Sequence, residues 1–215
     1  MHAGIIGGTG HEGRGVAARL ASAGVPVLVG SRQLERAQET VAALGTALPL
    51  GAATNEQVAS DCDVVFLAVP FSGVAELLEA FRTRFRPGAL VIDLTVPLTF
   101  DRGVPAIADV AEGSATEFIR ARLPAEVRLA AAFKTIPASA LAKIDTLLDC
   151  DEFVCGDTPE VSAAAIDLLS RIPSLRLLDA GGLRSARLIE RMTALAIVLN
   201  KRYKVRGARF KVVGM

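Results

Sequence analysis

A glycine-rich loop near the start of the chain constrains the fold more than any other feature. The apolar run Ala3 to Ile6 is followed by Gly8, Gly10 and Gly13, and then by apolar residues at helical spacing. A strand, a G-x-G-x-x-G turn and a helix in this order bring a pyrophosphate close to the backbone, at the positive end of the helix dipole. The sequence therefore predicts a dinucleotide-binding α/β fold.

The end of the second predicted strand, Val25 to Val29, indicates which dinucleotide binds. Sites selective for NAD usually carry Asp or Glu there, which accepts hydrogen bonds from the adenosine ribose. Here Ser31 and Arg32 follow the strand, and Arg36 lies one helical turn further on. A carboxylate would repel a 2′-phosphate, whereas a hydroxyl and two guanidinium groups can bind one. The predicted cofactor is NADP(H), bound by Ser31, Arg32, Arg36 and the loop residues Gly8, Thr9, Gly10, His11, Glu12 and Gly13.

Length and composition are typical of a globular enzyme. A chain of 215 residues that is 51% hydrophobic and 22% charged can bury a core without disulfides or metals. The three cysteines, Cys62, Cys150 and Cys155, form no C-x-x-C pair, so we expect them to be buried and to bind no metal. No stretch resembles a signal peptide or is long enough to span a bilayer, which predicts a cytoplasmic protein without a membrane partner.

Strand-like and helix-like segments alternate along the chain. Apolar runs predict strands at 3–6, 25–29, 64–69, 89–92, 128–132 and 153–155, with helical patterns between most of them. This alternation predicts the α/β class, a Rossmann-type doubly wound parallel sheet. Further along, we expect a helix to about 171, a strand at 175–178, a long helix at 183–203 and a last strand at 210–213. We predict an NADP-binding Rossmann domain over 1–155 and a small C-terminal α+β domain over 156–215 that completes the acceptor pocket.

The segments that follow the strands are the candidate site, because ligands of such sheets bind beyond the carboxyl ends of the strands. Three of these segments contain a proline, namely Pro70, Pro97 and Pro137. Each proline either ends its strand or helps to shape a flat slot for a nicotinamide ring. The cofactor-binding candidates in these segments are Val69, Pro70, Val96, Pro97 and Ala138.

Eight short motifs, read in order along nearly the whole chain, resemble one enzyme family. They are Gly7 to Gly10, Gly30 to Arg32, Ala68 to Phe71, Thr95 to Leu98, Ala132 to Ala138, Cys155 to Asp157, Asp179 to Gly181 and Ala186 to Glu190. In order and spacing they resemble the NADPH-dependent reductases of coenzyme F420, a 5-deazaflavin. The resemblance implies reversible hydride transfer between NADP(H) and F420 as co-substrate, with the two rings stacked where the domains meet.

The resemblance also implies where the acceptor binds. Lys134 and Ile136 belong to the segment that resembles the wall against which the rings pack. The other implied acceptor-binding residues are Arg187, Arg191 and Thr193 on the long C-terminal helix and Ala208 near the end of the chain. Three positions depart from the family pattern, since Lys134 replaces a frequent histidine and Gly182 and Ala194 replace prolines. Two alternatives therefore stay open: a reductase of a flavin or flavin-linked ferric acceptor, and a non-enzymatic NADP(H)-sensing module.

Catalytic acids or bases are not expected, because hydride transfer between stacked rings depends on proximity, orientation and a dry pocket. The two histidines, His2 and His11, lie in the first strand and the glycine loop, where neither can transfer a proton to the acceptor. Lys134 is the one candidate for a general acid or base at the end of a later strand. The alternative is an ordinary lysine that binds a phosphate or faces solvent.

Charge and apolar residues are unevenly distributed over the C-terminal region. Residues 183–215 contain nine basic side chains and one acidic side chain, Glu190, in a chain of net charge +1. Such an excess is typical of an anion-binding or a solvated surface. A nucleic-acid partner is not expected, since tryptophan is absent and there is one tyrosine. An apolar stripe, Leu188, Met192, Leu195 and Leu199, predicts either a homodimer or burial within the chain.

Overall fold

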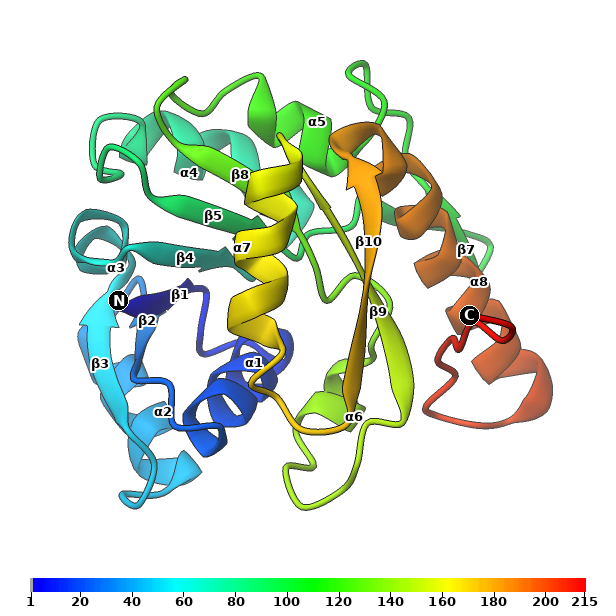
Figure 1. Cartoon of the computed structure of the whole chain (residues 1–215), viewed down its shortest axis with the longest axis horizontal. Coiled ribbons are helices and arrows are strands. Elements are labelled where there is room, and N and C mark those ends of the chain that lie inside the picture. Colours follow the sequence, from blue (N-terminus) through cyan, green and yellow to red (C-terminus); the bar gives the residue numbers. More distant parts are fainter. Residues whose placement is uncertain (1) are drawn as a thin grey trace.

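The computed structural model describes residues 2–215 and contains an eight-stranded sheet with helices on both faces (Figure 1). The strands are β1 (Ala3–Ile6), β2 (Val27–Ser31), β3 (Leu50–Thr54), β4 (Val64–Leu67), β5 (Leu90–Asp93), β8 (Arg128–Ala131), β9 (Cys150–Gly156) and β10 (Leu175–Gly182). Their order across the sheet is β10-β9-β8-β5-β4-β1-β2-β3. The strand order reverses at β1, with β2 and β3 added on one side and β4, β5 and β8 on the other, as in the Rossmann-type α/β fold that the alternating pattern predicted.

Two apolar cores lie on opposite faces of this sheet. The helices on one face are α1 (His11–Ser22), α2 (Leu34–Leu44), α6 (Ala138–Leu141) and α7 (Pro159–Leu169), and those on the other are α3 (Asn55–Asp61), α4 (Val74–Phe81) and α5 (Ala115–Arg120). Strand residues alternate between the cores, so that Ile5 and Phe66 belong to the first core and Ile6 and Leu67 to the second. Burial on both faces explains why β1 and β4 are continuous apolar runs.

The sheet is mostly parallel, which corrects the all-parallel prediction at one place. β8 and β9 pair antiparallel, through Ala130 with Gly156 and Ala131 with Cys155. β9 and β10 are parallel to each other and therefore run against the other six strands. The sequence offered no sign of this reversal, because an apolar strand reads the same in either direction.

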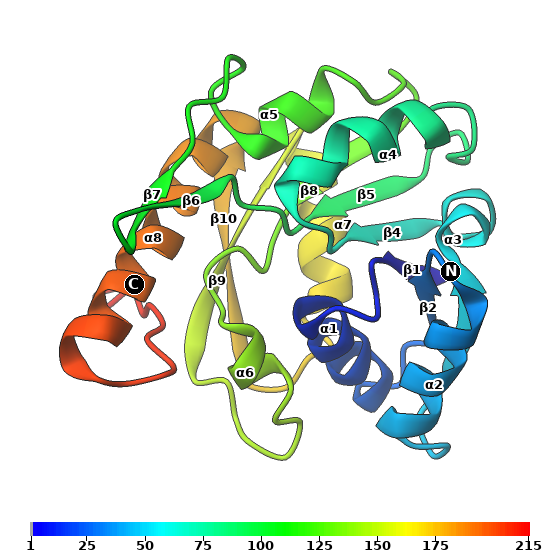
Figure 2. The ribbon, with the colours of Figure 1, turned by 180° about the vertical axis from the view of Figure 1, so that it is seen from behind.

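The C-terminal residues extend the same sheet. β10 lies within residues 156–215 and pairs with β9, so the sheet continues across the predicted domain boundary, and the division at 155 stays a prediction. The 3₁₀ turn η2 (Leu183–Ser185) then leads into α8 (Ala186–Tyr203), which lies beside a hairpin formed by β6 (Leu98–Asp101) and β7 (Val104–Ile107), as both ribbon views show (Figure 2).

Several elements differ from the predicted ones. The hairpin, β3 and α3 were not predicted, although Thr54 and Gln57 form a capping box that marks the start of α3. The strand predicted at 210–213 is wrong. The N–H of Asp151 donates to the main-chain oxygen of Phe210, but the N–H of Val212 donates to the Asp151 carboxylate and not to a main-chain oxygen, so a regular ladder does not form. The three cysteines are free and buried, as predicted. Among residues 2–215, no helix is both long and apolar enough to cross a membrane.

Candidate active site

The glycine loop joins β1 to the N-terminus of α1. Gly10 is the N-cap of α1, and no side chain caps this helix. The amides of its first turn consequently have no partner within the helix. A Cβ at Gly13 would lie 2.7 Å from the carbonyl oxygen of Gly7 and 2.8 Å from the Cα of Gly8, so the close packing of α1 on the loop requires glycine. Free amides and a backbone without side chains fit the pyrophosphate of a dinucleotide.

The predicted 2′-phosphate site lies at the end of β2. Ser31 is buried and its hydroxyl accepts a hydrogen bond from the N–H of Gln33. Arg32 and Arg36 are exposed, and neither forms an ion pair within residues 2–215. Both guanidinium groups therefore remain available to an anionic ligand, which fits NADP(H) better than NAD(H).

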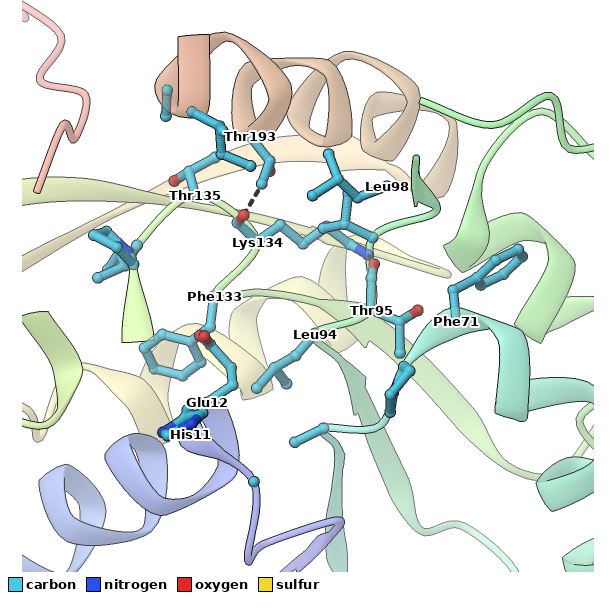
Figure 3. A pocket seen from close by; sticks show the side chains of 18 of the residues that line it. His11, Glu12, Phe71, Leu94, Thr95, Leu98, Phe133, Lys134, Thr135 and Thr193 are labelled. Carbon is cyan, nitrogen blue, oxygen red and sulfur yellow. Dashed lines mark hydrogen bonds between the residues drawn. The ribbon is translucent and has the colours of Figure 1, made fainter. Parts of the chain in front are cut away.

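One pocket of about 500 Å³ lies beyond the carboxyl ends of the central strands (Figure 3). Its walls come from the start of α1, the segments after β4, β5 and β8, and one face of α8. Ten predicted site residues line it: Gly10, His11, Glu12, Val69, Pro70, Val96, Lys134, Ile136, Thr193 and Ala208. A pocket of this size at this edge of the sheet is typical of a ligand-binding site.

Other predicted residues lie outside this pocket. Gly8, Thr9 and Gly13 belong to the glycine loop and the start of α1. Ser31 ends β2, Arg32 follows it, and Arg36 lies in the first turn of α2. Pro97 and Ala138 adjoin pocket residues without lining the pocket. Phe71, Leu98 and Phe133 also line the pocket, and they belong to the motifs after the strands that were predicted to form the site. Leu94 and Ile197 line it too, but the sequence did not single them out, because their apolar pattern indicated only burial.

Arg187 and Arg191, two of the implied acceptor-binding residues, do not line the pocket, and their role in acceptor binding stays a prediction. The Arg187 guanidinium donates to both carboxylate oxygens of Glu117, each at 2.7 Å, and to the carbonyl oxygen of Glu112 at 2.9 Å. Arg191 is exposed and donates to the carbonyl oxygen of Arg187. Arg187 therefore joins α8 to α5, since an acidic partner on a neighbouring helix holds it away from the pocket.

Lys134 is buried in a cage of acidic and polar groups. Its side chain has no exposed area, and its Nζ lies 2.8 Å from Asp93 Oδ2 and 3.3 Å from Glu190 Oε1. It also donates to the main-chain oxygen of Thr95. Lys134 is therefore neither a solvent-facing lysine nor a phosphate ligand, which corrects both of those predictions.

Electrostatics explain why this lysine stays charged. Burial alone would lower the pKa of Lys134, but the carboxylates of Asp93 and Glu190 outweigh it and hold the pKa above its ordinary value. Burial raises the pKa of Glu190 despite the opposing effect of Lys134. A lysine whose proton is held by two buried carboxyl groups is a poor general acid, so this geometry argues against the acid–base role considered from the sequence.

The buried cluster also fixes the walls of the pocket. Asp93 accepts hydrogen bonds from the N–H and hydroxyl of Thr95, both at 2.7 Å, and from the hydroxyl of Thr116. On α8, the Thr193 hydroxyl donates to the main-chain oxygen of Lys134 at 2.6 Å (Figure 3). The ends of β5 and β8 and the middle of α8 are thus joined around one lysine. The sequence did not predict that Asp93 and Glu190 are the partners of Lys134. The position of Asp93 directly after the apolar run 89–92 could have indicated that it lies at the site.

The fold and this site define a class of protein. A Rossmann-type sheet, a glycine loop at the head of α1 and a pocket across the strand ends are those of an oxidoreductase that binds a nicotinamide dinucleotide. Residues 2–97 match the model of the family described as NADP oxidoreductase coenzyme F420-dependent. Full-length relatives at 30% identity or more extend this match to the whole chain, which therefore belongs to the F420-dependent NADP reductase family.

Full-length relatives support this assignment. The chain is 37% identical to the F420-dependent NADP reductase of Methanothermobacter thermautotrophicus, over 100% of this chain and 96% of the relative. It is 30% identical to the enzyme of the same name from Methanocaldococcus jannaschii, over 100% and 99%. A crystal structure of a candidate F420-dependent NADP reductase from Arthrobacter sp. FB24 shares the fold, with a TM-score of 0.83, 23% identity and 99% of both chains covered.

Proposed function

We propose that this chain transfers hydride reversibly between NADP(H) and coenzyme F420, with the nicotinamide against the strand ends and the deazaflavin beneath α8. The observation that carries this proposal is a single pocket that extends from the first turn of α1 to the side chains of α8. A dinucleotide on the glycine loop would place its nicotinamide in this pocket, and the α8 side leaves room for a second ring system. The family assignment supports the choice of acceptor.

The residues of this chain have positioning roles in the proposed reaction. NADP(H), when bound, supplies or receives the hydride. The α1 amides bind its pyrophosphate, and Arg32 and Arg36 bind its 2′-phosphate. Apolar side chains, including Val69, Val96 and Ile136, exclude water and keep the rings in contact. The caged Lys134 fixes the segment that carries Ile136, so catalysis depends mainly on proximity and orientation.

The first prediction concerns this activity. When the protein is mixed with NADPH and oxidised F420, the absorption band of the oxidised deazaflavin is expected to disappear. The same mixture without protein is the control, and NADH in place of NADPH is expected to react far more slowly. Turnover with a flavin but not with F420 would instead support a flavin reductase. NADPH binding without turnover of either acceptor would support a sensing module.

We further propose that two copies of the chain associate through α8 and the β6–β7 hairpin. Leu188 and Leu195 are 68% and 48% exposed on α8, so burial within one chain does not account for these two residues of the apolar stripe. Phe100 and Val104 are 61% and 56% exposed on the adjacent hairpin. Since α8 and β7 pack side by side, these exposed apolar side chains lie on adjoining elements, and such a grouping is typical of an interface.

The corresponding prediction concerns mass in solution. Light scattering at micromolar concentration is expected to give about twice the 22.5 kDa of one chain. Leu195→Glu should shift the mass toward 22.5 kDa, because a charge would be buried at the centre of the interface. Glu79→Gln, an exposed change on α4, is the control and should stay dimeric. A single-chain mass for the unmodified protein would refute the dimer.

A further inference from the structure

Two buried carboxyl groups interact electrostatically near the pocket: Glu12 of α1, which lines it, and Glu152 of β9, which does not. Glu12 lines the pocket, and Figure 3 shows its side chain reaching from the start of α1 toward Phe133. Its Oε1 is buried and has no hydrogen-bond partner within residues 2–215. Glu152 is fully buried in β9, where its Oε1 accepts the N–H of Phe133 at 2.6 Å and its Oε2 accepts the Thr135 hydroxyl at 3.4 Å.

No basic side chain in the described part of the chain forms an ion pair with either glutamate. His11 and Arg14 are its neighbours on α1, and neither donates to Glu12. The Lys134 amine, on the adjacent wall, is bound to Asp93 and Glu190 instead.

The two carboxyl groups consequently hold protons at neutral pH. Burial, followed by the charge of Glu152, raises the pKa of Glu12 to about 8. Burial also raises the pKa of Glu152 to about 8, although hydrogen bonds from Phe133 and Thr135 oppose this. These donors stabilise a negative charge on Glu152, whereas Glu12 Oε1 has no donor. Of the two groups, Glu12 therefore gains less from losing its proton.

We propose that Glu12 meets the dinucleotide as a neutral carboxylic acid, so that NADP(H) binding requires a proton on this side chain. This inference rests on the proposed binding of NADP(H) at the start of α1. A carboxylate in the first turn would repel the phosphates that the helix N-terminus attracts. A protonated carboxyl has one donor and one acceptor and can pair with a carboxamide such as that of nicotinamide. Glu12 is thus a binding residue whose protonation state sets affinity.

The pKa of Glu12 in the free protein decides how the affinity for NADPH changes with pH. Binding uses the neutral form, which predominates below the Glu12 pKa of about 8 and is lost above it. Apparent affinity falls in proportion to the neutral fraction, so NADPH should bind about tenfold more weakly at about pH 9 than at about pH 7. At about pH 8, binding should take up roughly half a proton.

Calorimetric titration with NADPH tests this inference without any turnover. Dissociation constants are measured at about pH 7, 8 and 9, and proton uptake is obtained at pH 8 from two buffers of different ionisation enthalpy. Glu12→Gln, which stays neutral, should bind with little pH dependence and take up no proton. Glu152→Gln should move the pH midpoint lower, since it removes the charge next to Glu12. Glu79→Gln, an exposed change, should behave like the unmodified protein.

The outcomes separate this inference from the function on which it rests. If the unmodified protein binds NADPH equally at pH 7 and 9 and takes up no proton, Glu12 is not the group proposed here. An unchanged pH dependence in Glu12→Gln would also overturn the inference. Absence of NADPH binding at every pH would instead overturn the proposed function itself.

Discussion

Lys134→Ala is expected to destabilise the protein by about 3–5 kcal/mol, the usual cost of removing one partner from a buried ion pair. The substitution leaves Asp93 and Glu190 buried without the cation that both face, and it frees the Thr95 carbonyl. The measurement is the free energy of unfolding in a denaturant titration. Lys143→Ala, at an exposed lysine just after α6, is the matched control and should change this free energy little.

A second variant identifies the cause of this loss. Lys134→Met combined with Asp93→Asn removes both charges of the shorter pair and should recover part of the stability lost in Lys134→Ala. Activity should remain low in both variants, because the segment that carries Ile136 loses its anchor. An unfolding free energy of Lys134→Ala within about 1 kcal/mol of the Lys143→Ala value would show that the cluster stabilises little.

NADPH is expected to bind more tightly than NADH by about 2–4 kcal/mol, if Arg32 and Arg36 each make a charge-assisted contact to the 2′-phosphate. This difference corresponds to a ratio of dissociation constants of about 30 to 900. Arg32→Ala should lose most of the preference through weaker NADPH binding, while NADH binding stays nearly unchanged. Arg82→Ala, at an exposed arginine distant from β2, is the control. Equal constants for the two nucleotides in the unmodified protein would contradict this prediction.

The part of the fold that sequence predicts best is the part with strong local signals. β1, the glycine loop and α1 were recognisable because an apolar run, fixed glycine spacing and helical periodicity coincide there. β3 (Leu50–Thr54) was not recognised, since Gly51, Ala52 and Ala53 give a weak strand pattern. The β6–β7 hairpin was missed despite Arg102 and Gly103 at its turn, both with positive φ. Both strands of this hairpin are short and mostly exposed, so their sequence pattern resembles that of a loop.

The sequence predicted which segments form the candidate site but not which side chains, distant in sequence, contact one another there. Residues that follow strands, such as Pro70 and Val96, were found because topology alone puts them at one edge of the sheet. The partners of Lys134 were not found, because Asp93 and Glu190 lie 41 and 56 residues away along the chain. Arg187 was misplaced for the same reason, since its Glu117 partner lies 70 residues away. The family resemblance correctly indicated that α8 contributes to the pocket, but it did not indicate that the Arg187 side chain points to Glu117.

The way α8 closes the pocket has a consequence for synthesis. Glu190 and Thr193 belong to the last helix, yet they hold Lys134, which precedes them by more than fifty residues. While the nascent chain emerges, the strands from β1 to β8 can form before either residue is available. During that interval the Lys134 ammonium has one carboxylate partner, Asp93, in place of two. Completion of the cofactor pocket is therefore a late event of translation, and a chain that stops short of α8 can form much of the sheet without ever forming the active site.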